Sequence, residues 1–348
     1  MAVDERSDPC GGGRAPRASP GVGPLVQKAW QSRIAVPMFN IPYLPMMAPV
    51  VQALRDARCF GLVAVARLEW VKFHAGSLKA IREEYERTKD ERFTRLHLDH
   101  VPVIDEDHLR VDCGAVMREA LDLGYDSVMV DGSRLPLAEN IAETRRIVDL
   151  CRACGVPVEG ELGAVMGHEA GPMPPYEELF ATGRGFTDPA EAGRFVRETG
   201  ADWLSVAIGN VHGVISEKRV EKKVEARLNI AQLDRIAEVA GVPLVLHGGS
   251  GIRKAYVLEA VRHGIAKINV GTAIRQPYEA ALGVSVDKAL SDESGPGSSD
   301  IAKAQAAVYE EMRRVIREEL EVEGTADVLM PAAPARPERR GDGRGERG

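Results

Sequence analysis

PLVLHGGSGIRKAYVLEAVRHGIAKINV, residues 243–270, contains an apolar run, a glycine-rich turn, a helical pattern and a second apolar run. The helical pattern spans Ile252–His263 and is followed by Gly264, a residue type that commonly ends helices. Short and nearly continuous apolar runs are typical of parallel strands that are buried on both faces. This stretch therefore predicts two neighbouring parallel strands that are connected by a helix.

The same alternation extends over most of the 348-residue chain. Six further apolar runs precede the two in this stretch. The eight predicted strands are Ala35–Ile41, Gly61–Arg67, Thr94–Val101, Ser127–Asp131, Pro157–Leu162, Trp203–Ile208, Pro243–His247 and Lys267–Val270. Helical spacing of apolar residues occurs in Met46–Arg58, Leu137–Cys154, Asp188–Thr199, Ile230–Ala240 and Ile252–His263. Eight strand–helix units without a break in composition predict a (β/α)8 TIM barrel, which is an α/β fold.

The two ends of the chain lack apolar periodicity. Residues 1–24 and 331–348 are rich in Gly, Pro and Arg, and we expect both segments to be disordered. The barrel domain is therefore predicted to span residues 25–330. Within it, Thr272–Leu290 and Ile301–Leu320 follow the last strand and have helical patterns. These additional C-terminal helices lead us to expect a homodimer or a homotetramer.

Composition excludes several classes of protein. Hydrophobic residues make up 44% and charged residues 28% of the chain, and the formal net charge is −7. These values are typical of a soluble globular protein and indicate no basic surface for nucleic acid. No apolar run has the length needed to span a bilayer, and the N-terminus lacks the apolar segment of a secretory signal. We therefore expect a cytoplasmic protein that binds neither nucleic acid nor membranes.

Three histidines come at the ends of predicted strands. His100, His212 and His247 each follow an apolar run. The C-terminal ends of the strands meet on one face of a barrel, so the three imidazoles are expected to meet there. Three neutral histidine ligands with an open fourth position are typical of catalytic zinc. His97 points to the strand face opposite His100 if the segment stays extended, or else lies behind the site.

Carboxylates accompany these histidines. Asp99 precedes His100, Asp131 ends the fourth strand, and Glu159 and Glu161 lie two residues apart on one face of the fifth. Carboxylates that face a barrel mouth are costly unless they bind a metal or are hydrogen-bonded. For Glu159 and Asp131, a structural salt bridge is an equally good interpretation. Glu169 lies in a glycine-flanked loop that can bring a base over the site.

Two loops have the composition of an anion site. Gly248-Gly249-Ser250-Gly251 follows the seventh strand, and Asn269-Val-Gly271-Thr272 follows the eighth. Barrels often bind phosphate with backbone N–H groups of these two loops and a nearby helix N-terminus. A tight turn is the alternative interpretation of the first loop.

Taken together, these residues resemble the class II, zinc-dependent ketose-bisphosphate aldolases, which act on fructose or tagatose bisphosphate. The resemblance runs from about Val36 to Arg275. It is carried by seven motifs in the same order: His97-Leu-Asp-His100, Val130-Asp-Gly-Ser133 with Glu139-Asn-Ile141, Glu159-Gly-Glu-Leu-Gly163, Thr187-Asp-Pro189, Gly209-Asn-Val-His-Gly213, His247-Gly-Gly-Ser-Gly251 and Lys267-Ile-Asn-Val270.

The resemblance implies a role for each matching residue. His100, His212 and His247 would bind the catalytic Zn²⁺, and Asp131 and Glu161 a second divalent or monovalent cation. Asp99 would exchange a proton with the aldehyde-derived oxygen, and Glu169 would take the proton from the ketose-phosphate carbon. The dihydroxyacetone-phosphate part of the substrate would be held by Gly213, Gly248, Gly249, Ser250, Asn269, Gly271 and Thr272, with Asn40 nearby.

The chain departs from the family pattern at three places. Gly271 stands where the family usually has Asp, Arg67 where the second strand usually ends with Ser, and Ser216 where a lysine is usual. An inward Arg67 would add donors for a carboxylate or phosphate of the substrate, such as that of an acid-sugar derivative. Alternatively, Arg67 pairs with Glu69 or another acid at the rim.

These observations predict an aldehyde-lyase of carbohydrate metabolism: a zinc-dependent aldolase that reversibly cleaves a phosphorylated ketose through a metal-stabilised enediolate. The products would be a ketone like dihydroxyacetone phosphate and an aldehyde. Two alternatives remain. A metal-dependent epimerase or isomerase would need the same enediolate without cleavage, and Gly271 is compatible with a barrel that only binds a sugar phosphate.

Overall fold

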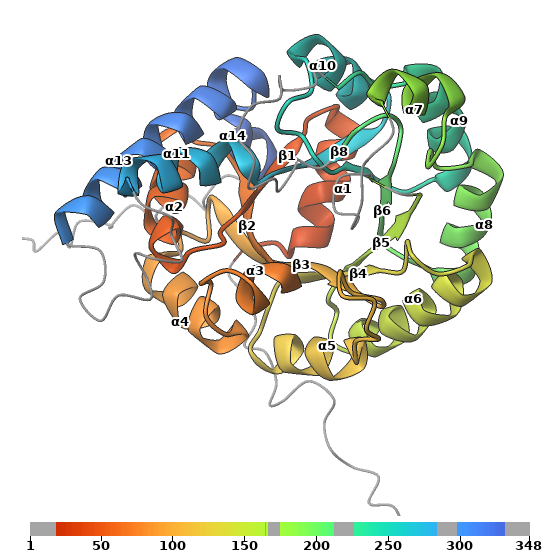
Figure 1. Cartoon of the computed structure of the whole chain (residues 1–348), viewed down its shortest axis with the longest axis horizontal. Coiled ribbons are helices and arrows are strands. Elements are labelled where there is room, and N and C mark those ends of the chain that lie inside the picture. The colour runs from red at the N-terminus through yellow and green to blue at the C-terminus, as the bar shows by residue number, and fades with distance from the viewer. Residues whose placement is uncertain (1–18, 164, 166–174, 212–225, 284–297, 331–348) are drawn as a thin grey trace, which may run out of the picture.

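The computed structural model describes residues 19–163, 165, 175–211, 226–283 and 298–330. Its eight parallel strands form a closed barrel in chain order, and helices surround the barrel (Figure 1). The strands are β1 Val36–Asn40, β2 Gly61–Ala66, β3 Thr94–Pro102, β4 Ser127–Asp131, β5 Val158–Leu162, β6 Trp203–Val206, β7 Leu244–Leu246 and β8 Ile265–Val270. The predicted (β/α)8 barrel is confirmed.

Nearly every strand residue is buried, as the continuous apolar runs indicate. Close packing of the helices on the barrel is visible at Gly160, which lies between the two inward-facing glutamates of β5. A Cβ atom there would come within 2.8 Å of Phe195 on helix α8. Glycine thus allows this helix to approach the outer face of β5, while Glu159 and Glu161 point into the barrel.

The helices follow the predicted pattern, with some boundaries moved. They are α1 Val22–Ser32, α2 Met47–Asp56, α3 Arg67–Val71, α4 Leu78–Thr88, α5 Cys113–Asp122, α6 Leu137–Arg152, α7 Tyr176–Thr182, α8 Pro189–Thr199, α9 Ile230–Ala240, α10 Lys254–Arg262, α11 Thr272–Leu282, α13 Ser298–Arg314 and α14 Thr325–Leu329. A short 3-10 helix, Leu44–Met46, precedes α2, and a π-helical turn, Val315–Glu319, follows α13. No helix among the described residues combines the length and the apolar character that a membrane span requires.

Helix α1 corrects the end of the predicted disordered segment over residues 1–24, of which residues 1–18 lie outside the described residues. It begins at Val22 and buries Val22, Leu25, Val26 and Ala29, an apolar stripe at helical spacing. In Figure 1 it lies in the middle of the ring. It covers the N-terminal ends of the strands, where buried Arg95 of β3 donates hydrogen bonds of 2.9 Å to Ser19 Oγ and to the Pro20 carbonyl. The predicted disordered tail, residues 331–348, lies outside the described residues.

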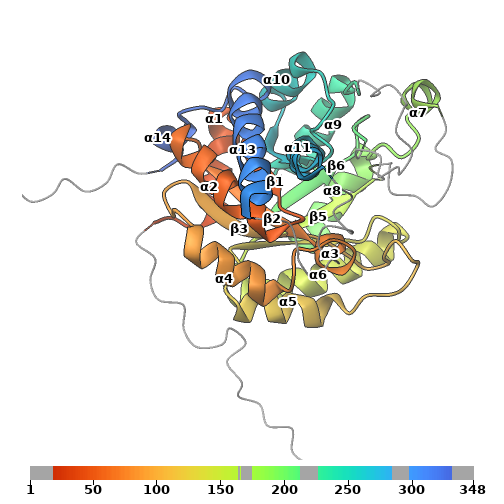
Figure 2. The ribbon, with the colours of Figure 1, turned by 60° about the vertical axis from the view of Figure 1, so that its left-hand side comes forward.

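The C-terminal helices pack on the barrel of their own chain. Helix α11 ends at Leu282, earlier than predicted, because Gly283 adopts a left-handed conformation with φ of 71°. Helix α13 lies beside α11 and α2 in both ribbon views (Figures 1 and 2). Tyr309 on α13 donates a hydrogen bond of 2.9 Å to Asp56 at the end of α2.

Candidate active site

A cavity of about 260 Å³ lies at the C-terminal ends of the strands. This is the face of a barrel on which active sites are found. The cavity is lined by predicted site residues from six strands or the loops that follow them: Asn40, Asp99, His100, Asp131, Glu161, His247, Gly248, Ser250, Asn269, Gly271 and Thr272.

Strand β3 presents two adjacent side chains to this cavity because its backbone is irregular. The pairing of β3 with β4 shifts register between Leu98 and Val101, and His100 has a φ of 31°. A bulge of this kind re-aims a side chain. Consequently Asp99 and His100 both line the cavity, whereas regular alternation would place them on opposite faces. His97 is not turned outward: it is fully buried behind the site, with its Nδ1 atom 2.8 Å from Ser127 Oγ.

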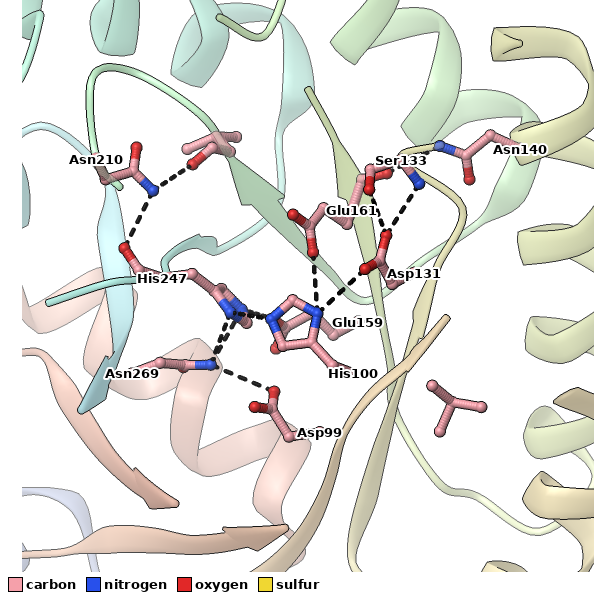
Figure 3. Close-up of polar contacts among 12 residues, drawn as sticks. Asp99, His100, Asp131, Ser133, Asn140, Glu159, Glu161, Asn210, His247 and Asn269 are labelled. Carbon is pink, nitrogen blue, oxygen red and sulfur yellow. Dashed lines mark hydrogen bonds and ion pairs between the residues drawn. The ribbon is translucent and has the colours of Figure 1, made fainter. Parts of the chain in front are cut away.

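The two described histidines of the predicted zinc site face each other. Nε2 of His100 lies 2.7 Å from Nδ1 of His247 (Figure 3). One oxygen of Asp99 and one ring nitrogen of each of the two histidines all lie within 4.8 Å of one another, so three possible ligand atoms come together here. Of the predicted zinc ligands, His212 lies outside the described residues.

A second group of possible ligands shares His100. Its Nδ1 atom lies 3.3 Å from Asp131 Oδ2 and 3.4 Å from Glu161 Oε2, the two residues predicted to bind a second cation. Glu161 Oε2 is buried and makes no hydrogen bond within the described part of the chain. Burial raises the pKa of Glu161 well above its usual value, and the charge of Asp131 adds to this effect. A cation would satisfy this oxygen and favour its ionised form.

The charge on His100 follows from these carboxylates. Burial alone would lower the pKa of this histidine, but Asp99, Glu161 and Asp131 outweigh burial and raise the pKa to about 10. The pKa of His247 is instead lowered, first by burial and then by His100. The site therefore holds a positive charge at His100 and a neutral imidazole at His247.

A buried chain of polar groups fixes the ring of His247. Its Nε2 atom lies 2.8 Å from Glu159 Oε1, and Glu159 Oε2 accepts a hydrogen bond of 2.8 Å from Lys267 Nζ. Donation from Nε2 to the carboxylate leaves the Nδ1 lone pair facing His100, which is how carboxylates orient histidine ligands. Glu159 thus makes the salt bridge that the sequence left open, and it also positions a predicted metal ligand.

Asp99 is held between two amides. Asn40 Nδ2 donates to Asp99 Oδ2 at 2.9 Å, and Asn269 Nδ2 donates to Asp99 Oδ1 at 3.3 Å. Burial would raise the pKa of Asp99, but the positive charges of His100 and Lys267 lower it below its usual range. Asp99 is therefore an ionised carboxylate at the cavity wall.

The two predicted anion loops meet on the other side of the cavity. Ser250 Oγ accepts a hydrogen bond of 3.1 Å from the N–H of Ala273, in the first turn of α11. Gly249 packs against β8, where a Cβ atom would come within 2.8 Å of the Asn269 carbonyl oxygen. Gly249 does not line the cavity, but its lack of a side chain brings the first loop to the N-terminus of α11. At Gly271 a Cβ atom would lie 3.6 Å from Cβ of Asn40, which is an ordinary van der Waals contact.

Arg67 does not line the cavity. Its Nη1 atom lies 3.3 Å from Oδ2 of buried Asp105, a rim acid, which is the second of the two interpretations of this residue. Glu69, two residues later, lines the cavity instead. Its Oε2 atom accepts hydrogen bonds from the Ala66 N–H at 2.7 Å and from Asn40 Nδ2 at 3.4 Å. Burial, and then the charge of Asp99, raises the pKa of Glu69 to about 8.

Sequence reasoning missed other residues of the cavity wall, among them Phe73, Ser133, Arg134 and Arg275. Ser133 belongs to a motif that the resemblance used, and its Oγ donates to Asp131, which could have identified it. Of the predicted residues, Glu169, His212 and Gly213 lie outside the described part of the chain, so their roles stay predictions.

Comparisons with known proteins agree with this geometry. Residues 22–327 match the family described as class II fructose-bisphosphate aldolase. The YdjI aldolase from Escherichia coli K12 is similar in structure, with 26% identity, a TM-score of 0.65 and coverage of 88% of this chain and 98% of that chain. A putative fructose-1,6-biphosphate aldolase from Coccidioides immitis has 25% identity, a TM-score of 0.67 and coverage of 88% and 97%. A fructose-bisphosphate aldolase from Campylobacter jejuni, at 17% identity and a TM-score of 0.63, shares the fold over 88% of this chain and 98% of its own.

Proposed function

The chain belongs to the class II fructose-bisphosphate aldolase family, and on this premise we propose that it is a zinc-dependent aldolase. It would cleave a phosphorylated ketose reversibly into a ketone like dihydroxyacetone phosphate and an aldehyde. The observation that carries the proposal is the approach of His100 Nε2 to His247 Nδ1 beside Asp99 in the cavity.

The residues present suit a zinc ion. Imidazole nitrogens and carboxylate oxygens are its usual ligands, and the Nδ1 atom of His247 is oriented by Glu159 from behind. We propose His212 as the third histidine ligand and the group of His100, Asp131 and Glu161 as a site for a second cation. When bound, zinc would supply a Lewis acid that polarises the ketone carbonyl of the substrate.

The protein's own residues would do the rest of the chemistry. Asp99 is ionised and held by two amides, so it can accept a proton from the substrate hydroxyl whose carbon becomes the aldehyde, and return it in the reverse direction. The loop with Ser250 and the N-terminus of α11 would hold the phosphate. Glu169 is proposed as the base at carbon. These fixed contacts orient the substrate between the two proton-transfer groups.

Removal of the metal is expected to abolish cleavage and proton exchange together. In deuterated water, the zinc-loaded protein should exchange one carbon-bound proton of dihydroxyacetone phosphate, as followed by NMR, and should release an aldehyde from one or more ketose phosphates of a substrate panel. Chelator treatment should stop both reactions, and zinc should restore them. Undiminished cleavage after complete zinc removal would refute the proposal. Exchange with inversion at carbon but without aldehyde release, across the panel, would indicate an epimerase instead.

Zinc binding is expected to release at least one proton and to strengthen as the pH rises. The pKa of His100, about 10 without the ion, means that this ligand is protonated at neutral pH. Zinc must displace that proton, so its affinity should rise about tenfold per pH unit up to that pKa. Calorimetric titration in buffers of different ionisation enthalpy measures the protons released. Release of no proton at pH 7 would contradict this expectation.

A further inference from the structure

We propose that Glu69 determines which aldehyde this enzyme accepts, by receiving a hydrogen bond from the hydroxyl group next to the aldehyde carbon. The inference rests on the proposed aldolase activity and adds a specificity residue to it. Glu69 belongs to none of the motifs from which that activity was inferred.

Glu69 is connected to Asp99 through a single amide group. Asn40 Nδ2 donates to Asp99 Oδ2 at 2.9 Å and to Glu69 Oε2 at 3.4 Å. Asn40 is itself buried, with 8% exposure, so both carboxyl groups are held in place relative to each other. Glu69 therefore lies one amide away from the group proposed to exchange a proton with the aldehyde oxygen.

The second oxygen of Glu69 is available to a ligand. The Ala66 N–H and Asn40 both donate to Oε2, whereas Oε1 makes no hydrogen bond to any residue that the structure describes. Glu69 is half-buried and lines the cavity. Its neighbour Leu68 also lines the cavity but offers only apolar atoms. A carboxyl oxygen accepts a hydrogen bond from a hydroxyl group whether or not the carboxyl group is ionised.

The position of Glu69 assigns it to the aldehyde half of the substrate. The proposed phosphate site lies after β7 and β8, at Ser250 and the N-terminus of α11. Gly271 faces Asn40 from that side, and Glu69 contacts Asn40 from the side of β2. A ketose whose phosphate lies at α11 and whose reacting bond lies at Asp99 would extend its remaining carbons toward Glu69.

The test compares two aldehydes that differ by one hydroxyl group. The full-length, zinc-loaded protein condenses dihydroxyacetone phosphate with glycolaldehyde, which has the hydroxyl group, or with acetaldehyde, which lacks it. The quantity measured is the ratio of kcat/KM for glycolaldehyde to kcat/KM for acetaldehyde. In Glu69→Ala this ratio should fall about tenfold or more, as expected for loss of one hydrogen bond to a carboxyl group. Glu69→Gln keeps a polar group of the same length and should retain part of the preference.

Glu83→Ala is the matched control. Glu83 lies on α4, is exposed and pairs with Lys79, so the same change of side chain should leave the ratio unaltered. A role of Glu69 only in capping α3 or in holding Asn40 would lower both kcat/KM values equally. An unchanged ratio in Glu69→Ala would therefore overturn the inference. If that variant does not fold, Glu69→Asp, which is one methylene shorter, should lower the ratio, and an unchanged ratio there overturns the inference too.

Proton exchange of dihydroxyacetone phosphate without any aldehyde separates this inference from the proposed function. Exchange should persist in the Glu69 variants, because no aldehyde takes part in it. If the wild-type protein itself shows neither exchange nor condensation, the aldolase proposal is wrong, and the assignment of Glu69 falls with it. Normal exchange and condensation with an unaltered aldehyde preference would refute the assignment of Glu69 alone.

Discussion

Replacement of Lys267 by methionine is expected to lower the free energy of unfolding by about 3–5 kcal/mol. Lys267 and Glu159 are both fully buried inside the barrel, and Nζ lies 2.8 Å from Oε2. Methionine would fill a similar volume but would leave the Glu159 carboxylate without its cation in the barrel interior. Urea unfolding followed by circular dichroism measures the change.

The same substitution at an exposed lysine provides the control for this prediction. Lys79→Met removes a surface ion pair with Glu83, and its effect on the free energy of unfolding should stay within about 0.5 kcal/mol.

The pH dependence of stability gives a second check of the Lys267 prediction. Burial would raise the pKa of Glu159, but Lys267 and His247 lower it to about 2. The pair therefore contributes stability above the unfolded pKa of about 4.5, and this contribution is lost as the pH falls toward 2. The difference between wild type and Lys267→Met should shrink over that range; equal stability of the two proteins at pH 7 would contradict the account.

His100→Ala is expected to reduce aldol cleavage by about a thousandfold or more. His100 belongs to both groups of possible metal ligands, so its loss removes a nitrogen from each. The Lewis-acid contribution of a catalytic metal amounts to several kcal/mol, and each 1.36 kcal/mol is tenfold in rate. Initial rates on the ketose phosphate that wild type cleaves best measure the loss, together with the zinc content of the purified variant.

His263→Ala is the matched histidine control. His263 follows α10, away from the cavity, where it pairs with Asp234 and Glu259. This variant should retain both zinc and activity. Retention of full activity and stoichiometric zinc by His100→Ala would remove His100 from the mechanism.

The barrel could be predicted because the same sequence pattern is repeated along the chain. Each strand is an apolar run that is buried on both faces, and helical patterns separate several of them. Helix α1 was not predicted, although Val22, Leu25, Val26 and Ala29 have helical spacing. Its apolar stripe begins directly after a glycine- and proline-rich segment, and composition dominated the interpretation of those residues.

The site was predictable where it depends on position along a strand. Glu161 follows from the alternation of side chains within β5, and His247 follows from its place directly after β7. The placement of His100 beside Asp99 could not be predicted in the same way, because it requires the register shift between β3 and β4. Regular alternation turns one of the two residues outward, and a shift of this kind depends on pairing with a strand far along the chain.

The residues that follow β2 could not be assigned from the sequence for a different reason. Arg67 and Glu69 are two charged residues in one short segment, and only tertiary contacts decide which of them faces the cavity. Asp105, from the loop after β3, binds Arg67 at the rim, and Asn40 of β1 binds Glu69 at the cavity wall. Neither partner is near in sequence, so no local pattern contains this information.

The central claim is that His100 and His247 bind the same metal ion. Anomalous diffraction from a crystal of the zinc-loaded protein, recorded on both sides of the zinc absorption edge, tests it most directly. We predict one strong anomalous peak at the C-terminal mouth of the barrel, about 2.0–2.1 Å from His100 Nε2 and from His247 Nδ1. A fully occupied zinc ion bound elsewhere, with no peak between these two rings, would contradict the account.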